Sequence, residues 1–137
     1  MPQLDREKLK VYHEALAFVG EATSLFERVA KSLAVHHQLD RASTAIPLNI
    51  AEGGGKWTAP DRCRFYDIAR GSALECAAWV DVLVVKKALR AEDIIKPKET
   101  LVRAVSMLVG LFKAVAPGRV YEEEAVYANP SEGASAR

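Results

Sequence analysis

The sequence predicts an all-α protein, an antiparallel up-down-up-down four-helix bundle. Three observations lead to this fold class. Apolar residues recur at the three- and four-residue spacing of helices, the connections between these periodic segments are short, and no segment shows the two-residue alternation of strands. The chain has 137 residues, half of them apolar, which is about the length of one domain with one core. We therefore expect one bundle domain over residues 1–118.

The first predicted helix begins near Leu9 and runs to Leu33. Two apolar stripes follow it at helical spacing on neighbouring faces, and together they are wider than a single bundle seam requires. We therefore expect this helix to serve two interfaces. One stripe contains Leu9, Tyr12, Leu16, Val19, Phe26, Ala30 and Leu33, with Thr23 as a departure, and the other contains Val11, Ala15, Phe18, Ala22, Leu25 and Val29.

The second predicted helix runs from His36 to Glu52 and stops at the glycines 53–55. Pro47 lies inside it and has no N–H to donate to the carbonyl of Ser43, so we expect a kink or a break at Ile46–Pro47. The positions expected to face the core are Leu39, Ala42, Ser43, Ile46 and Ile50.

The third predicted helix begins at Thr58, a hydroxyl N-cap followed by Pro60 and by Asp61 three residues after the cap. It is expected to run to about Leu89. Small residues in its middle, among them Gly71, would let a neighbouring helix approach closely. The expected inward positions are Phe65, Ile68, Ala69, Ser72, Cys76, Trp79, Val80 and Leu83, and the small stripe also includes Ala73 and Ala77.

The fourth predicted helix has Pro97 in its first turn and ends at Pro117–Gly118. Its apolar face consists of Leu101, Val105, Leu108, Phe112 and Val115. Residues 119–137 lack sustained periodicity and hold two arginines against four glutamates. We expect them to form a disordered acidic tail.

The overall charge is close to balance, with 19 Lys and Arg against 18 Asp and Glu. This excludes the heavy basic excess of a histone-like coat protein. Cys63 and Cys76 lie in one predicted helix, too far apart to form a disulfide, and no apolar run approaches the ~20 residues that span a bilayer. We therefore expect a soluble cytoplasmic protein without a membrane partner.

Two motifs carry a resemblance to a known family. Residues 38–53 read QLDRASTAIPLNIAEG, and Phe65 and the segment IARGSALE at 68–75 follow them. This pattern resembles the 23S rRNA intervening-sequence protein family, whose members carry a core like QLrrAa.SIPaNIAEG and then F..fL.iA.GSa.E. Asp40 and Ala45 depart from that pattern, where a basic residue and a serine are common. The matching residues are Gln38, Leu39, Arg41, Ala42, Ile46, Pro47, Asn49 through Gly53, Phe65, Ala69, Gly71, Ser72 and Glu75.

The resemblance covers roughly residues 8–116 and implies a four-helix protomer in a ring-shaped homopentamer with a basic surface that meets nucleic acid. It also extends to the accessory variability determinant of diversity-generating retroelements, which works beside a reverse transcriptase. The implied partner is therefore RNA or a ribonucleoprotein, although likeness of fold does not transfer function.

Basic residues gather around the two motifs and are the candidate nucleic-acid contacts. Alternatively, they pair with Asp61, Asp67 and Glu75 or are solvated. Three further basic residues, 86, 87 and 90, lie at the far end of the third helix. Trp57 would stack a base in one interpretation, and pack under its own loop or at a subunit contact in the other. The candidate contacts are Arg41, Lys56, Arg62, Arg64 and Arg70.

The remaining motif residues are interpreted as structural. Asn49 and Glu52 lie one turn apart beside the proline, where Asn49 would satisfy freed carbonyls and Glu52 would bond Ser72 or a neighbouring helix. We assign a structural role to Pro47, Asn49, Glu52, Gly53, Gly71, Ser72 and Glu75.

No catalytic, cofactor or metal site is expected. His36, His37 and Asp40 lack the spacing that aligns two metal ligands, and the glycines before Lys56 do not follow a strand or form a phosphate-binding loop. The interpretation is a non-enzymatic, homo-oligomeric protein that binds RNA or a ribonucleoprotein. The alternatives are a protein-interaction scaffold without nucleic-acid binding and an enzyme that uses Glu52, Asn49 and Glu75 in an intersubunit cleft.

Overall fold

The computed structural model describes residues 3–29 and 34–116 and confirms the all-α class. It contains helices α1 (Gln3–Phe26), α2 (Ala34–Gly54), α3 (Ala59–Val85) and α4 (Ile95–Val115), and the short 3-10 helix η1 (Ala91–Ile94). No strand occurs within these two ranges. The expected tail and the domain boundary at residue 118 lie outside the described residues.

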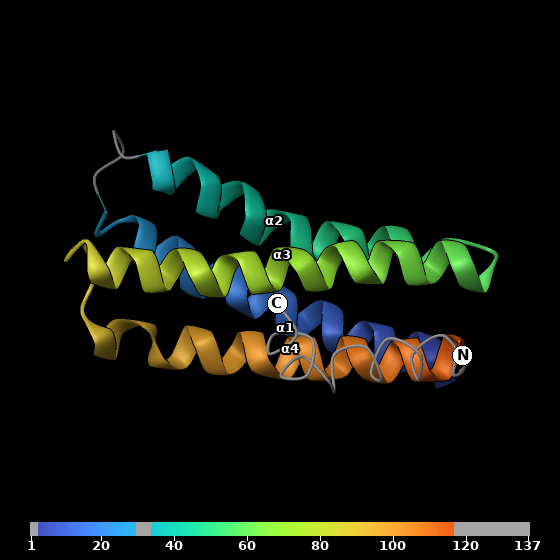
Figure 1. The fold of residues 1–137 in the computed structure, drawn as a ribbon. Helices are drawn as coiled ribbons and strands as arrows, with labels where there is room; N and C mark the ends of the chain where they lie inside the picture. Colours follow the sequence, from blue (N-terminus) through green and yellow to red (C-terminus); the bar gives the residue numbers. More distant parts are fainter. Residues whose placement is uncertain (1–2, 30–33, 117–137) are drawn as a thin grey trace, which may run out of the picture.

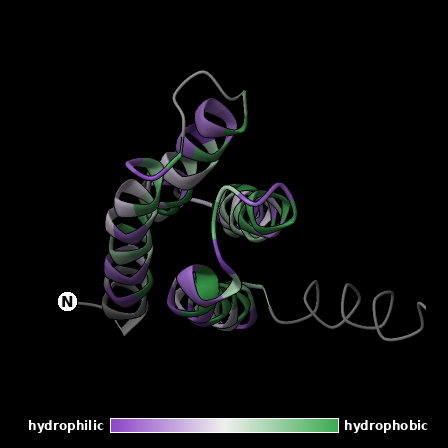
Figure 2. Ribbon diagram, turned by 90° about the vertical axis from the view of Figure 1, so that its left-hand side faces the viewer, coloured by the Kyte–Doolittle hydropathy of each residue, from purple (hydrophilic) through white to green (hydrophobic). Residues whose placement is uncertain are grey.

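Each helix packs against the one before it, and α1 also packs against α4. The chain turns back at each connection, which is consistent with the predicted up-down-up-down topology (Figure 1). A view nearly along α3 and α4 shows α1 inclined to both of them (Figure 2). No helix within the described ranges has the length and apolarity to cross a membrane.

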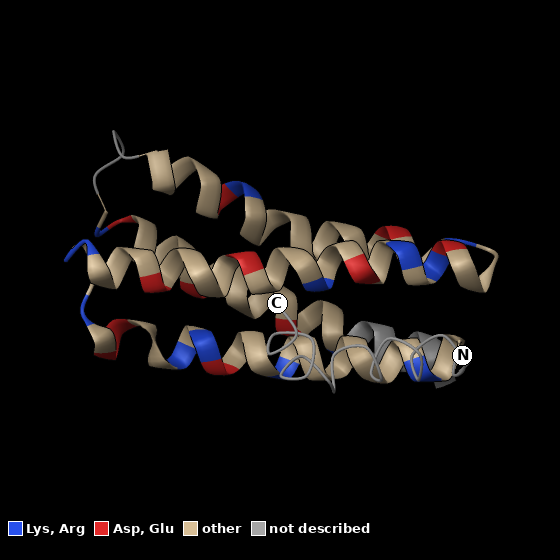
Figure 3. Cartoon of the chain, viewed as in Figure 1, with Lys and Arg blue, Asp and Glu red and all other residues tan. Residues whose placement is uncertain are grey.

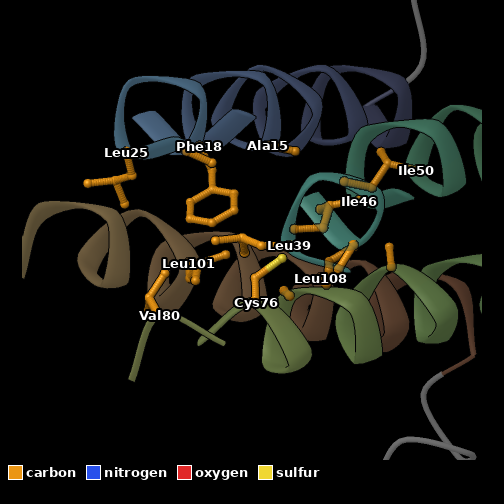
Figure 4. Close-up of a cluster of buried hydrophobic side chains, with 14 of the residues drawn as sticks. Ala15, Phe18, Leu25, Leu39, Ile46, Ile50, Cys76, Val80, Leu101 and Leu108 are labelled. Atoms are coloured by element: carbon orange, nitrogen blue, oxygen red, sulfur yellow. The ribbon is translucent and has the colours of Figure 1, made fainter. Parts of the chain in front are cut away.

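Helix α1 buries one of its two predicted stripes completely, and among the described side chains of the other stripe only Phe26 is buried. Val11, Ala15 and Phe18 are fully buried, and Figure 4 shows Ala15 and Phe18 in the core with side chains from the other helices. Leu16, from the other stripe, is 40% exposed. The helix also ends at Phe26 and not at Leu33, because a tight turn follows in which Val29 N donates to Phe26 O at 3.0 Å. Ala30 and Leu33 lie outside the described residues.

Helix α2 continues without a break through Pro47, so the predicted break is wrong. Figure 1 shows its first half slanting toward α3 and its second half running along α3, which agrees with the alternative prediction of a kink. Because Pro47 is itself buried against the rest of the bundle, packing offsets the loss of its hydrogen bond. All five predicted inward positions are buried: Leu39, Ala42, Ser43, Ile46 and Ile50.

Helix α3 begins as predicted, with Asp61 N donating to Thr58 Oγ1 at 3.3 Å. It ends at Val85, four residues before the predicted end. Lys87 has a left-handed φ of 63°, and Ala88 N donates to Leu83 O at 2.9 Å, which together close the helix in a Schellman motif. Leu89 is still buried beyond this turn, so the apolar pattern outlasts the helix.

The buried face of α3 differs in part from the predicted one. Ala69, Cys76, Val80 and Leu83 are buried as expected, whereas Ile68 is 43% exposed. Phe65, Ser72 and Trp79 are only partly buried. Three further positions complete the buried face: Cys63, Tyr66 and Ala73.

Helix α4 confirms the predicted face, since Leu101, Leu108 and Phe112 are buried and Val105 packs against the core. Pro97 lies in its first turn and is buried. Helix η1 was not predicted. It begins where Arg90 N donates to Asp93 Oδ2 at 2.8 Å, a capping bond that the connection between α3 and α4 supplies.

Candidate nucleic-acid interface

The structure gathers three of the five candidate basic residues at one end of the bundle. Lys56 lies in the turn between α2 and α3, and Arg62 and Arg64 lie in the first turns of α3. Figure 3 shows basic residues at this end of α3 and in the turn. Arg70 lies about 12 Å along α3 from Arg62, at 1.5 Å per residue. Arg41 lies in the first half of α2, on the order of 20 Å from Lys56.

The turn that carries Lys56 is held at both ends. Lys56 N donates to Gly53 O at 3.2 Å, and Arg62 Nε donates to Lys56 O at 2.8 Å. After the turn, Arg62 N donates to Thr58 O at 3.0 Å, which starts the ladder of α3. The main chain on either side of Trp57 is therefore fastened to the two helices.

Two cations of this end lie over one aromatic ring. Lys56 Nζ is 5.0 Å and Arg64 Cζ is 4.6 Å from the ring centroid of Phe65, within the range of cation–π attraction. The sequence pattern placed Phe65 in the core, but the structure leaves it half-buried under these side chains. In the sequence, only the neighbouring Arg64 indicates this cation–π contact, because Lys56 comes close to the Phe65 ring only when the chain folds.

Trp57 is 97% exposed and does not pack under its own loop. The structural alternative for this residue, packing under the loop, is therefore wrong for the protomer. An aromatic side chain of this size is rarely left so accessible, since its burial would stabilise the fold by about 2 kcal/mol or more. Its position beside Lys56 makes it part of the same surface.

Arg41 is engaged elsewhere. Its Nη2 donates to Glu75 Oε2 at 2.8 Å and to Gln38 Oε1 at 3.1 Å, and the same Glu75 oxygen accepts from Trp79 Nε1 at 3.1 Å. Arg70 Nη1 lies 3.5 Å from Asp67 Oδ1. Both arginines thus follow the alternative of pairing with nearby carboxylates.

Two of the motif residues act on α2 itself. Asn49 Nδ2 donates to Ala45 O at 2.8 Å, so it satisfies a carbonyl beside Pro47, although not that of Ser43. Glu52 is exposed and pairs with Lys56 at 3.4 Å, and the described contacts include no bond from it to Ser72.

The two motif glycines differ in their surroundings. A Cβ on Gly53 would lie 2.7 Å from Tyr66 Cε1, so the close approach of α2 to α3 requires glycine there. A Cβ on Gly71 would meet nothing within 4 Å, so the packing of the protomer does not require that glycine. Ser72, beside it, is half-buried.

Within the described residues, no group of three or more His, Cys, Asp or Glu side chains could hold a metal ion. His36, from the polar segment at the start of α2, packs its ring 5.0 Å from that of Phe26. Cys63 and Cys76 are free and buried. Burial, reinforced by the neighbouring Glu75, raises the pKa of Cys76 to about 12, so its thiol is a poor nucleophile.

A second surface feature lies between α3 and α4. It is an apolar groove of about 190 Å³ lined by residues that include Ala77, Val105 and Lys98. Two large apolar side chains that line it are exposed, Leu74 at 51% and Val102 at 64%.

Comparison with known proteins agrees with the fold. Residues 7–110 match the model of a family described as 23S rRNA-intervening sequence protein. A crystal structure of a protein with unknown function from the S23 ribosomal protein family of Bacteroides thetaiotaomicron VPI-5482 superposes with a TM-score of 0.73 at 19% identity, covering 78% of this chain and 98% of that chain. The comparison with curated proteins gave no match. Neither match indicates an enzymatic family.

Proposed function

The chain belongs to the 23S rRNA-intervening sequence protein family, and from this premise we propose that it is a non-enzymatic protein that binds RNA, free or in a ribonucleoprotein, at the end of the bundle formed by Lys56, Arg62 and Arg64. One observation carries the proposal: within the described residues, neither Arg62 nor Arg64 forms an ion pair with a carboxylate. Their charges are therefore available to phosphates.

The electrostatics of this end suit phosphate binding. Lys56 and Arg64 are held over the Phe65 ring and Arg62 is fixed by its bond to the turn, so the three cations are ordered before any ligand arrives. Glu52 and Asp61 lie nearby and reduce the local positive charge. Binding should therefore be moderate and should weaken steeply as salt rises, because each bound phosphate releases condensed counterions.

We also propose that the protein assembles as a homo-oligomer, with the pentamer of the resemblance as the expected size. Repetition around a ring would multiply a modest patch into a continuous basic annulus. The two free, buried cysteines support action in the reducing cytoplasm.

The test is a titration of the purified protein against a structured RNA at two salt concentrations, with the mass of the assembly measured in the same buffer. The variant Lys56→Glu/Arg64→Glu removes two cations and leaves the Arg62 bond that fastens the turn. We expect it to bind far more weakly and to lower the slope of log affinity against log salt by about 0.7–0.9 for each phosphate that the variant no longer neutralises.

The matched control is Lys86→Glu/Lys96→Glu, which changes the net charge equally at exposed positions. Lys86 lies about 36 Å along α3 from Arg62, at 1.5 Å per residue. Equal losses of affinity in the two double variants would show a non-specific effect of net charge. Absence of salt-sensitive binding by the wild-type protein would contradict the proposal.

The second candidate function is a protein-interaction scaffold, and the apolar groove between α3 and α4 favours it. Leu74→Glu/Val102→Glu would place carboxylates on both exposed sides of this groove. A scaffold without nucleic-acid binding predicts that this variant no longer captures a protein partner, whereas an RNA-binding oligomer built through this face predicts loss of assembly with RNA binding by each protomer intact. If the RNA-binding proposal is right, Lys56→Glu/Arg64→Glu should instead lose RNA binding and keep its assembly.

A further inference from the structure

We propose that the ligand of this interface is single-stranded RNA, and that one unpaired base of that strand stacks on the indole of Trp57. The inference rests on the proposed function and names the class of RNA that the site takes. The proposal is argued from the position of the exposed Trp57 indole at the end of the bundle that also carries Lys56, Arg62 and Arg64.

The position of Trp57 is defined although its side chain touches little. The residue before it is bonded to both helices, through Lys56 N to Gly53 O and Arg62 Nε to Lys56 O, and the residue after it, Thr58, caps α3. Because the main chain is already fastened, stacking a flat ligand on the 97% exposed indole costs only the rotamer freedom of that side chain.

The two partly buried aromatic rings of α3 are already occupied. Phe65 has Lys56 Nζ and Arg64 Cζ over its ring, at 5.0 Å and 4.6 Å. Trp79 is half-buried and donates to Glu75. Of these rings, Trp57 alone has both faces accessible to a base.

The chemistry of stacking selects an unpaired base. In a duplex the faces of the bases are covered by their neighbours, whereas bases in loops and single strands can splay out onto aromatic side chains. Lys56 adjoins Trp57 in the chain, and Lys56 and Arg64 both lie over the Phe65 ring, so a phosphate next to the stacked base would meet positive charge. The arrangement combines a stacking surface with nearby positive charge, the two elements of non-specific single-strand binding.

The experiment uses an end-labelled oligoadenylate of about ten nucleotides, a length that fits one site, and the same strand annealed to oligouridylate. Anisotropy titrations of both probes compare the wild-type protein with Trp57→Ala and Trp57→Phe. Because Trp57 is exposed, neither substitution should change the melting temperature, which serves as the folding control.

We expect Trp57→Ala to weaken single-strand binding between about fivefold and a hundredfold and duplex binding less than about twofold. Trp57→Phe should retain most of the affinity. The single strand should quench the indole fluorescence of the wild-type protein, and that quenching should be absent in Trp57→Phe.

Unchanged single-strand affinity in Trp57→Ala, with binding still abolished in Lys56→Glu/Arg64→Glu, would overturn the stacking inference and leave the proposed function intact. A lower assembly mass in Trp57→Ala would also overturn it, by showing that a second copy of the chain covers the indole. Failure of the wild-type protein to bind either probe at low salt would overturn the stacking inference, and failure to bind the structured RNA as well would overturn the proposed function.

Discussion

Gly53 of α2 lies directly against the ring of Tyr66 of α3. A Cβ at Gly53 would be 2.7 Å from Tyr66 Cε1 and 3.2 Å from the carbonyl oxygen of Arg62. Tyr66 is only 1% exposed, so its ring has little room to move away. This contact sets how closely the end of α2 approaches the start of α3, and it therefore positions the turn that carries the basic residues and Trp57.

Gly53→Ala should destabilise the protein by about 1–3 kcal/mol, because the added methyl group overpacks this contact. Gly71→Ala is the matched control. Its Cβ would enter open space within a helix, so it should stabilise the protein by about 0.5–1 kcal/mol. Urea unfolding of both variants measures the difference. Equal effects of the two substitutions would contradict the proposed packing role of Gly53.

Lys87→Gly should stabilise the protein by about 1 kcal/mol, because Lys87 holds a φ of 63° that a side chain disfavours and glycine does not. Thermal unfolding would show a higher melting temperature. Lys86→Gly provides the comparison, since Lys86 has an ordinary right-handed φ of −76°. Stabilisation by both substitutions would mean that the left-handed turn is not the cause.

Arg41→Ala should weaken RNA binding less than Arg64→Ala, because Glu75 already neutralises the charge of Arg41 at 2.8 Å. Its effect on stability should also be small, about 0–1 kcal/mol, since the Arg41 side chain is exposed. Titration of both variants at one salt concentration gives the ranking. A larger decrease of affinity in Arg41→Ala would place Arg41 at the RNA interface.

Cys63 and Cys76 should resist alkylation in the folded protein at about pH 8. Both are fully buried, and a pKa of about 12 leaves only about one Cys76 thiol in ten thousand ionised at that pH. Trp57→Cys, at a position that is 97% exposed in the wild-type protein, should react rapidly with the same reagent and serves as the positive control. Labelling of Cys76 at a comparable rate would contradict the described packing of α3.

Acid should weaken the connection between α3 and α4. The bond from Arg90 N, followed by the bond from Arg28, lowers the pKa of Asp93 below its usual 3.8. The charged carboxylate is therefore more favourable in the folded state, and its contribution is complete above the pKa of the unfolded chain and disappears as pH falls through the lower folded value.

Asp93→Asn should consequently show a shallower fall of unfolding free energy between about pH 5 and about pH 2 than the wild-type protein. Glu92→Gln is the control, because Glu92 is exposed and lies 3.6 Å from Arg90. The measurement is urea unfolding at several pH values. Identical slopes for the wild-type protein and Asp93→Asn would rule out the assigned role of Asp93.

The helices and their order follow from the sequence by itself, because local rules determine them. The N-cap at Thr58 and Asp61 depends on neighbouring residues, and so does the inward face of α2 from Leu39 to Ile50. Both predictions are confirmed. The family also followed from short motifs, since residues 38–53 and 65–75 carry most of the pattern.

Only the tertiary structure decided the choices that depend on a partner element. Two apolar stripes on α1 are equivalent in sequence, and packing against α2 and α4 buries the one that contains Phe18. Helix α2 continues through Pro47 because the buried proline packs against the rest of the bundle. Arg41 meets Glu75 across 34 residues of chain, and Lys56 reaches the ring of Phe65 across the turn between α2 and α3. Such pairings join residues that only folding brings together, and no local pattern contains them.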